Sequence, residues 1–215
     1  MFNFTRSLIY NSRLERIYSA RFKEFGSQPS GSFWLNEQRQ TSRFQIILNQ
    51  IVTLKPRGSV SIADVGCGYG ALANFINKRP EYGRFVYFGF DINKNLVNEC
   101  KRSISSSRTR FYIGNRPKFN VGFSVMSGTY NLAVTKNIKN WENYIFDCLE
   151  ACWNKSIYGM VFNLLIAKRA FISDGRIYYT KLEDFKKNCV RQFGPTVAVQ
   201  ESSLPQDVTM VVTRK

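Results

Sequence analysis

The feature that most constrains the fold of this chain is a run of alternating glycines between an apolar segment and a helical one. Residues 60–65 are mostly apolar, Gly66, Gly68 and Gly70 follow, and residues 71–78 have helical periodicity. Glycine lets a backbone turn sharply at positive φ and pass close to a ligand that a Cβ would displace. The loop also exposes backbone N–H groups at the start of a helix. The pattern predicts a ligand-binding turn between a strand and a helix.

A second apolar segment, residues 85–90, ends in Asp91 about twenty residues beyond the loop. A carboxylate at that point can accept hydrogen bonds from both hydroxyls of a ribose, and each charge-assisted bond contributes roughly 1.5 to 3 kcal/mol. Strand, glycine loop, helix, strand and acid in this order indicate a nucleoside-binding unit.

Two cofactor classes use such a unit, and the loop also satisfies a dinucleotide fingerprint through Gly66, Gly68 and Ala71. Three details favour S-adenosylmethionine: Asp64 lies two residues before the first glycine, Gly70 is a third alternating glycine, and about sixty residues precede the first strand. Nicotinamide binding, and a tight turn without a ligand, are the alternatives.

Short β-branched runs alternate with helical stretches from residue 59 onward, which predicts a parallel sheet covered by helices. We expect strands at 60–65, 85–90, 110–113, 121–126 and 159–165, and a terminal antiparallel pair at 196–201 and 208–213. Helices are expected at 5–25, 36–54, 71–78, 94–103, 141–155 and 181–193, with a chain break at 55–58. The predicted fold class is α/β, a seven-stranded, mostly parallel Rossmann-like sheet. Residues 1–215 form one domain in this reading, with a helical cap at 1–57 and the core at 58–215.

The composition sets limits on location. The N-terminal residues develop no apolar signal core. The most apolar window, residues 158–167, is about half of the roughly 20 residues that a membrane-spanning helix needs. We expect a cytoplasmic protein with no membrane partner.

The residue types also limit the chemistry. The chain has no histidine, and its five cysteines form no CxxC pair, so neither a zinc site nor a histidine-dependent triad is expected. The cysteines are interpreted as reduced small hydrophobes, with Cys148 and Cys152 facing the core.

The chain carries 31 basic and 15 acidic residues, a formal net charge of +16. Such a charge makes a polyanionic partner worth considering. No tail or block concentrates it, so charge alone leaves RNA as an alternative substrate rather than the first choice.

The residues 64–70 (Asp-Val-Gly-Cys-Gly-Tyr-Gly) and 88–92 (Phe-Gly-Phe-Asp-Ile) resemble the class I S-adenosylmethionine-dependent methyltransferase family over roughly residues 58–130. A poorly characterised small subgroup is also similar over nearly the whole chain. That second resemblance depends on residues 21–26, Trp34, Gln40, Arg43, Phe44, 127–131, Trp141, Tyr144 and 162–163.

The resemblance implies a role for each site residue. Gly66, Cys67, Gly68 and Gly70 would pack against the methionine part of the cofactor, with Asp64 ordering the loop or meeting the amino group. Asp91 would hold the ribose and Ile92 would pack on the adenine. Asn115 stands where such enzymes often have an acid for the adenine amino group. Ser127 and Gly128 would border the sulfonium.

The acceptor side is less defined. Trp34, Arg43 and Tyr130 are candidates for the lid or the acceptor walls. No Asn-Pro-Pro-aromatic tetrapeptide follows the fourth strand, which counts against methylation of amino groups on DNA bases. No catalytic residue can be named, since orientation alone can drive transfer to a nucleophilic acceptor. The expected function is methyl transfer to a small molecule; an RNA methyltransferase, a catalytically inactive S-adenosylmethionine-binding protein and a nicotinamide oxidoreductase are the alternatives.

Overall fold

The computed structural model describes residues 4–34, 36–55 and 57–214. Residues 1–3 lie outside this part of the chain, and they begin the stretch in which we expect no signal segment. Pro56, in the predicted chain break, lies outside it as well.

A seven-stranded sheet in the order β3-β2-β1-β4-β5-β9-β8 forms the centre of the fold. Its strands are β1 (Val60–Val65), β2 (Phe85–Asp91), β3 (Thr109–Ile113), β4 (Val121–Met126), β5 (Ser156–Leu165), β8 (Thr196–Val199) and β9 (Asp207–Thr213). β1 to β5 pair in parallel, while β9 is antiparallel to both β5 and β8. The predicted fold class, including the antiparallel C-terminal pair, is confirmed.

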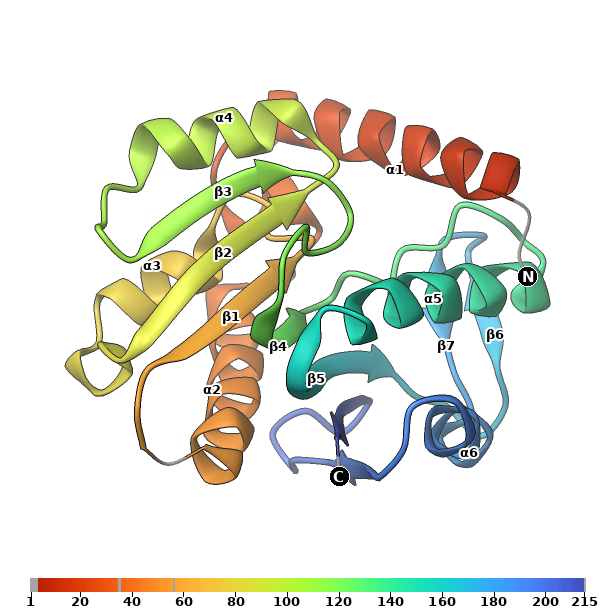
Figure 1. Ribbon diagram of the computed structural model, residues 1–215. Coiled ribbons are helices and arrows are strands. Elements are labelled where there is room, and N and C mark those ends of the chain that lie inside the picture. Colours follow the sequence, from red (N-terminus) through yellow and green to blue (C-terminus); the bar gives the residue numbers. More distant parts are fainter. Residues whose placement is uncertain (1–3, 35, 56, 215) are drawn as a thin grey trace.

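Helices cover both faces of this sheet (Figure 1). They are α1 (Phe4–Phe25), α2 (Glu37–Leu54), α3 (Ala71–Asn77), α4 (Lys94–Ser103), α5 (Ile138–Trp153) and α6 (Leu182–Gln192), with 3-10 turns at Pro29–Ser32 and Pro80–Tyr82. α2, α3 and α4 pack on one hydrophobic cluster, and α5 and α6 on the other. β1 serves both clusters because its side chains alternate: Val60 and Ile62 join the first, Ala63 and Val65 the second.

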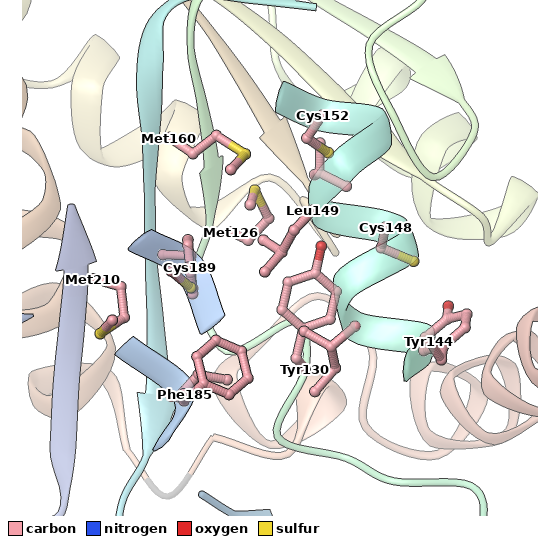
Figure 2. Packing of buried hydrophobic residues seen from close by; sticks show 14 of the residues in the cluster. Met126, Tyr130, Tyr144, Cys148, Leu149, Cys152, Met160, Phe185, Cys189 and Met210 are labelled. Atoms are coloured by element: carbon pink, nitrogen blue, oxygen red, sulfur yellow. The ribbon is translucent and has the colours of Figure 1, made fainter. Parts of the chain in front are cut away.

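The cluster under α5 is rich in sulfur (Figure 2). Met126, Met160 and Met210 from three strands meet the cysteines of α5 and α6 there, all nearly excluded from solvent. Burial raises the pKa of the Cys189 thiol to about 12, so this cysteine acts as a small hydrophobe.

A small hairpin, β6 (Phe171–Ser173) with β7 (Ile177–Tyr179), was not predicted. Each strand has three residues, too few to show a period of two. Asp174 and Gly175 turn the chain at positive φ. Backbone bonds such as Tyr178 N–H to Asn131 O (2.9 Å) dock the hairpin beside the loop after β4.

α1 lies across the edge of the sheet at which the parallel strands end, and the arrowheads of β1 and β2 point toward it (Figure 1). Asn93, just after β2, donates from Nδ2 to Ser19 Oγ of this helix (2.8 Å). Binding sites of open parallel sheets form at this edge. None of the helices in the part of the chain described here is long and apolar enough to cross a membrane.

Candidate cofactor site

The glycine loop follows β1 directly and is tied to the end of β2. The backbone N–H groups of Gly66 and Cys67 both donate to Phe90 O, at 2.7 and 3.1 Å. Gly66, Gly68 and Gly70 have φ values of 78°, 55° and 80°, which L side chains rarely adopt. A Cβ on Gly66 would lie 2.8 Å from the Thr129 side chain, so glycine is also needed there for space. The loop is therefore fixed in a conformation that few other residues allow.

Asp91, the last residue of β2, closes this arrangement. Its Oδ2 accepts a hydrogen bond from Gly68 N–H (2.9 Å) and its Oδ1 one from Asn93 N–H (2.8 Å). The residue is only 8% exposed. Burial raises the pKa of Asp91 to about 6, and the bonds from Asn93 and Gly68 oppose that shift. Each carboxylate oxygen has a further lone pair for a ligand hydroxyl.

Asp64 lies beneath the loop. Tyr87 donates from its hydroxyl to Asp64 Oδ2 at 2.5 Å. Burial raises the pKa of Asp64 to about 7; the Tyr87 bond lowers it, and the nearby Asp91 raises it further. The neighbourhood thus holds two buried carboxyl groups that titrate close to neutrality.

The chain after β4 forms the opposite wall. Gly128, at φ 75°, donates from its backbone N–H to Asn163 Oδ1 (2.7 Å), and Thr129 Oγ1 donates to Val65 O (2.8 Å). These bonds connect the loop after β4 to β5 and to the end of β1.

A pocket opens between these walls, with about 920 Å³ of empty space when its open mouth is included. It brings together most of the residues predicted from the sequence. Lining it are Asp64, Gly66, Cys67, Gly68, Asp91, Ile92, Asn115, Ser127 and Gly128, together with the predicted lid residues Trp34 and Tyr130.

Two predicted site residues lie outside its lining. Gly70 caps α3, and a Cβ on it would meet Ile104 of the core at 2.4 Å, so its place is structural. Arg43 lies in an adjoining pocket, where its Nη2 donates to Asp207 Oδ2 at 2.7 Å.

Several lining residues were missed from the sequence. α1 and the segment after it contribute Leu14, Tyr18 and Ser32, α2 contributes Gln40 and Phe44, and the others are Tyr69, Ala71, Leu72, Gly114, Thr129, Tyr144 and Cys148. Tyr18 belongs to the apolar stripe that predicted α1, which could have marked it as buried but not as part of a pocket. Cys148 is 8% exposed and lines the pocket, whereas Cys152 is fully in the core, as expected.

The donor set fits S-adenosylmethionine. Among the described residues, four buried side-chain atoms have no hydrogen-bond partner, and three of them, Ser32 Oγ, Ser127 Oγ and Tyr130 OH, belong to residues lining this pocket. Buried polar atoms are normally paired. Together with the glycine loop and the Asp91 carboxylate, these groups offer the polar contacts that a nucleoside with an amino acid side chain requires. Within the described ranges, no three acidic or cysteine side chains gather as metal ligands would.

Comparisons with known proteins agree with this geometry. No protein-family model matches the chain. A Mycobacterium tuberculosis (strain H37Rv) protein named "Putative methyltransferase Rv1506c" is 26% identical over 156 residues, covering 72% of this chain and 93% of the relative.

Solved structures share the fold at low identity. A SAM-dependent methyltransferase from Leishmania major has a TM-score of 0.64 at 13% identity, covering 93% of this chain and 82% of that one. The SAM-bound amino pentose methyltransferase CalS10 from Micromonospora echinaspora gives 0.60 at 11%, covering 82% and 91%. Magnesium protoporphyrin IX methyltransferase from Synechocystis, with bound SAM, gives 0.53 at 11%, covering 82% and 80%.

The strand order of the sheet, and the hydrogen bond that ties the glycine loop to Asp91, define a class I methyltransferase fold. With the methyltransferase relative, they confirm the resemblance found in the motifs: the chain is similar to the class I S-adenosylmethionine-dependent methyltransferases and has their fold.

Proposed function

We propose that this protein binds S-adenosylmethionine in the pocket between the glycine loop and the segment after β4, and transfers its methyl group to a small-molecule acceptor. The observation that carries the proposal is the hydrogen bond of Gly68 to Asp91, at the wall of a pocket that shares four lining residues with a second one.

The cofactor-site residues predicted from the sequence have the following proposed roles. Asp91 accepts the ribose hydroxyls through its remaining lone pairs, and Ile92 and Asn115 border the adenine. The methionine part lies against the backbone of Gly66, Cys67 and Gly68, with Asp64 beneath it. Ser127 and Gly128 border the sulfonium, and Gly70 only shapes the loop.

When bound, the cofactor supplies a methyl on a sulfonium: an acceptor lone pair forms the new bond to carbon while the carbon–sulfur pair returns to sulfur. The protein's task is orientation, which in aligned reactions reaches effective molarities of about 10⁵ to 10⁸ M. α1 and Trp34 cover the pocket and limit the access of water to it. We assign no general base, because an acceptor that is already nucleophilic needs none.

The adjoining pocket is the proposed acceptor site. It shares Tyr18, Ser32, Trp34 and Gly128 with the cofactor pocket, so a molecule in it would lie next to the predicted sulfonium position. The cap and the β6–β7 hairpin flank it, since Phe33 and Trp34 line one part and Ile177 and Tyr179 another. A concave, largely apolar pocket with a few polar groups suits a small acceptor.

Two measurements test the proposal. Calorimetry should detect S-adenosylhomocysteine binding but no heat with NAD, and a metabolite panel should yield S-adenosylhomocysteine from S-adenosylmethionine. Binding without turnover across the panel would favour a catalytically inactive binder. Salt-dependent RNA binding at about 50 mM salt, with methyl incorporated into RNA, would replace the small-molecule acceptor by RNA.

A further inference from the structure

The proposed acceptor pocket has a one-sided charge. Two arginines, Arg39 and Arg43, line it, and no carboxylate is among its described lining residues. The remaining lining is apolar or neutral, with Phe33, Leu132 and Ile177 among the apolar side chains. A pocket with this lining discriminates against cationic molecules and favours anionic ones.

The Arg43 side chain is buried and fixed by its neighbours, unlike a solvated surface cation. Its side chain is 10% exposed, and its Nη2 donates to Asp207 Oδ2 at 2.7 Å. The guanidinium lies 4.6 Å from the centre of the Trp34 ring. Asp207 in turn accepts from Asn163 Nδ2 at 2.9 Å. The guanidinium is thus held in one orientation, and yet its buried Nε–H has no hydrogen-bond partner in the described part of the chain.

Arg39 lies one helical turn before Arg43 on α2, and residues four apart share a helix face. It is half-buried and makes no ion pair with any residue in the described ranges. Two cations on one helix face, of which only Arg43 is paired with a carboxylate, leave one net positive charge. Like charges at this spacing destabilise a helix. An anion in the pocket relieves that repulsion and supplies the acceptor that Arg43 Nε lacks.

We propose that the methyl acceptor carries an anionic group, a carboxylate or a phosphate, that binds Arg39 and Arg43, while its apolar part lies against Phe33, Leu132 and Ile177. The inference rests on the proposed function, since it assigns the substrate class of the same site. Arginine suits the task because its planar guanidinium donates two parallel hydrogen bonds to such a group.

The test uses the full chain saturated with S-adenosylhomocysteine, whose binding is measured first by calorimetry. Small anions are then compared with neutral partners that carry the same ring, beginning with 4-hydroxybenzoate against 4-hydroxybenzamide and phenyl phosphate against phenol. We expect at least one anion to bind about ten-fold more tightly than its neutral partner. The two pairs distinguish a carboxylate from a phosphate.

Variants assign the effect to the pocket. Arg39→Gln should remove the preference for the anion and leave the affinity for S-adenosylhomocysteine unchanged. Arg43→Gln alone would leave the buried Asp207 carboxylate without its cation. The second arginine is therefore tested as Arg43→Gln with Asp207→Asn, and as Arg43→Lys. Arg108→Gln, an exposed arginine just before β3, is the matched control and should keep the full preference.

Equal affinity for every anion and its neutral partner, or a preference that survives Arg39→Gln and the double variant, overturns the inference while S-adenosylhomocysteine binding still supports the proposed function. Absence of S-adenosylhomocysteine binding overturns the proposed function itself, and is seen in the first step.

Discussion

Gly68 donates its backbone N–H to Oδ2 of Asp91 at 2.9 Å, a bond between residues 23 positions apart. It joins the turn after the first strand to the end of the second. Here one carboxylate fixes the loop and faces the pocket, so changes to Asp91 affect both.

Asp91→Asn should weaken S-adenosylhomocysteine binding about ten-fold or more, because charge-assisted bonds contribute roughly 1.5 to 3 kcal/mol. Calorimetry at pH 7.5 measures the affinity. Asp184→Asn, which removes an exposed carboxylate paired with Lys181, is the control and should leave the affinity unchanged. If Asp91→Asn binds like the wild type, the ribose is held elsewhere.

The pH dependence of binding follows from the same residue. Burial raises the pKa of Asp91 to about 6, so its ionised form, the better acceptor for ribose hydroxyls, is lost as the pH falls through that value. We expect affinity to drop between pH 7.5 and 5.5 in the wild type and to vary much less in Asp91→Asn. Parallel pH curves for the two proteins would contradict the assignment.

The free energy of unfolding should depend on pH in the direction opposite to that of the affinity. Burial raises the pKa of Asp64 to about 7, above the usual 3.8, so the folded protein holds a proton that the unfolded chain has released. The contribution of Asp64 to stability is therefore full below about pH 4 and is lost as the pH rises toward 7. Urea unfolding should show the difference between wild type and Asp64→Asn changing across this window. A constant difference would mean that Asp64 does not titrate there.

Gly66→Ala should destabilise the protein more than Gly58→Ala. Both residues have φ near +78°, but a Cβ on Gly58 would meet no atom of the described residues within 4 Å, whereas on Gly66 it would lie 2.8 Å from the Thr129 side chain. Strain at positive φ costs about 1 to 3 kcal/mol, and overpacking adds a similar amount at Gly66 only. Urea unfolding of the two variants isolates the steric part, and equal losses would show that the loop can move aside.

The sequence predicted the elements more accurately than the contacts between them. The bounds of β1, β4 and α4 match the expected ranges, because those segments have clear periodicity and clear breaks. The hairpin β6–β7 escaped because three-residue strands carry no periodic signal. The glycine loop and Asp91 stand out in the sequence because their chemistry is local, and the structure places them together at one pocket. Tyr18, by contrast, reaches the pocket only through the docking of α1, which no local pattern records.

Arg43 illustrates the same limit. On the sequence it is a cation in an amphipathic helix, and its partner Asp207 is 164 residues away. Removing one partner of such a buried pair leaves an uncompensated charge, at a cost of about 3 to 5 kcal/mol. Arg43→Met and Asp207→Asn should each approach that loss in urea unfolding, and the double variant should lose less than the sum. Lys181→Met, in an exposed pair, should cost at most about 1 kcal/mol. Additive losses at Arg43 and Asp207 would show that the two charges are not coupled.

Tyr130 and Tyr144, both labelled in Figure 2, line the same pocket but differ in the hydrogen bonding of their hydroxyl groups. Tyr144 donates its hydroxyl to Asn11 Oδ1 at 2.6 Å, whereas the buried Tyr130 hydroxyl has no hydrogen-bond partner among the residues that the structure describes. Tyr144→Phe should therefore cost about 1 kcal/mol of stability, the usual net value of a hydrogen bond. Tyr130→Phe should cost nothing or stabilise the ligand-free protein, since it removes an unpaired buried polar group. If that hydroxyl serves the ligands, the same variant should weaken S-adenosylhomocysteine binding or lower turnover at least several-fold. A Tyr130→Phe protein with unchanged binding and turnover would make the residue a filler of the core, whereas a loss of function without a loss of stability assigns its hydroxyl to the ligand.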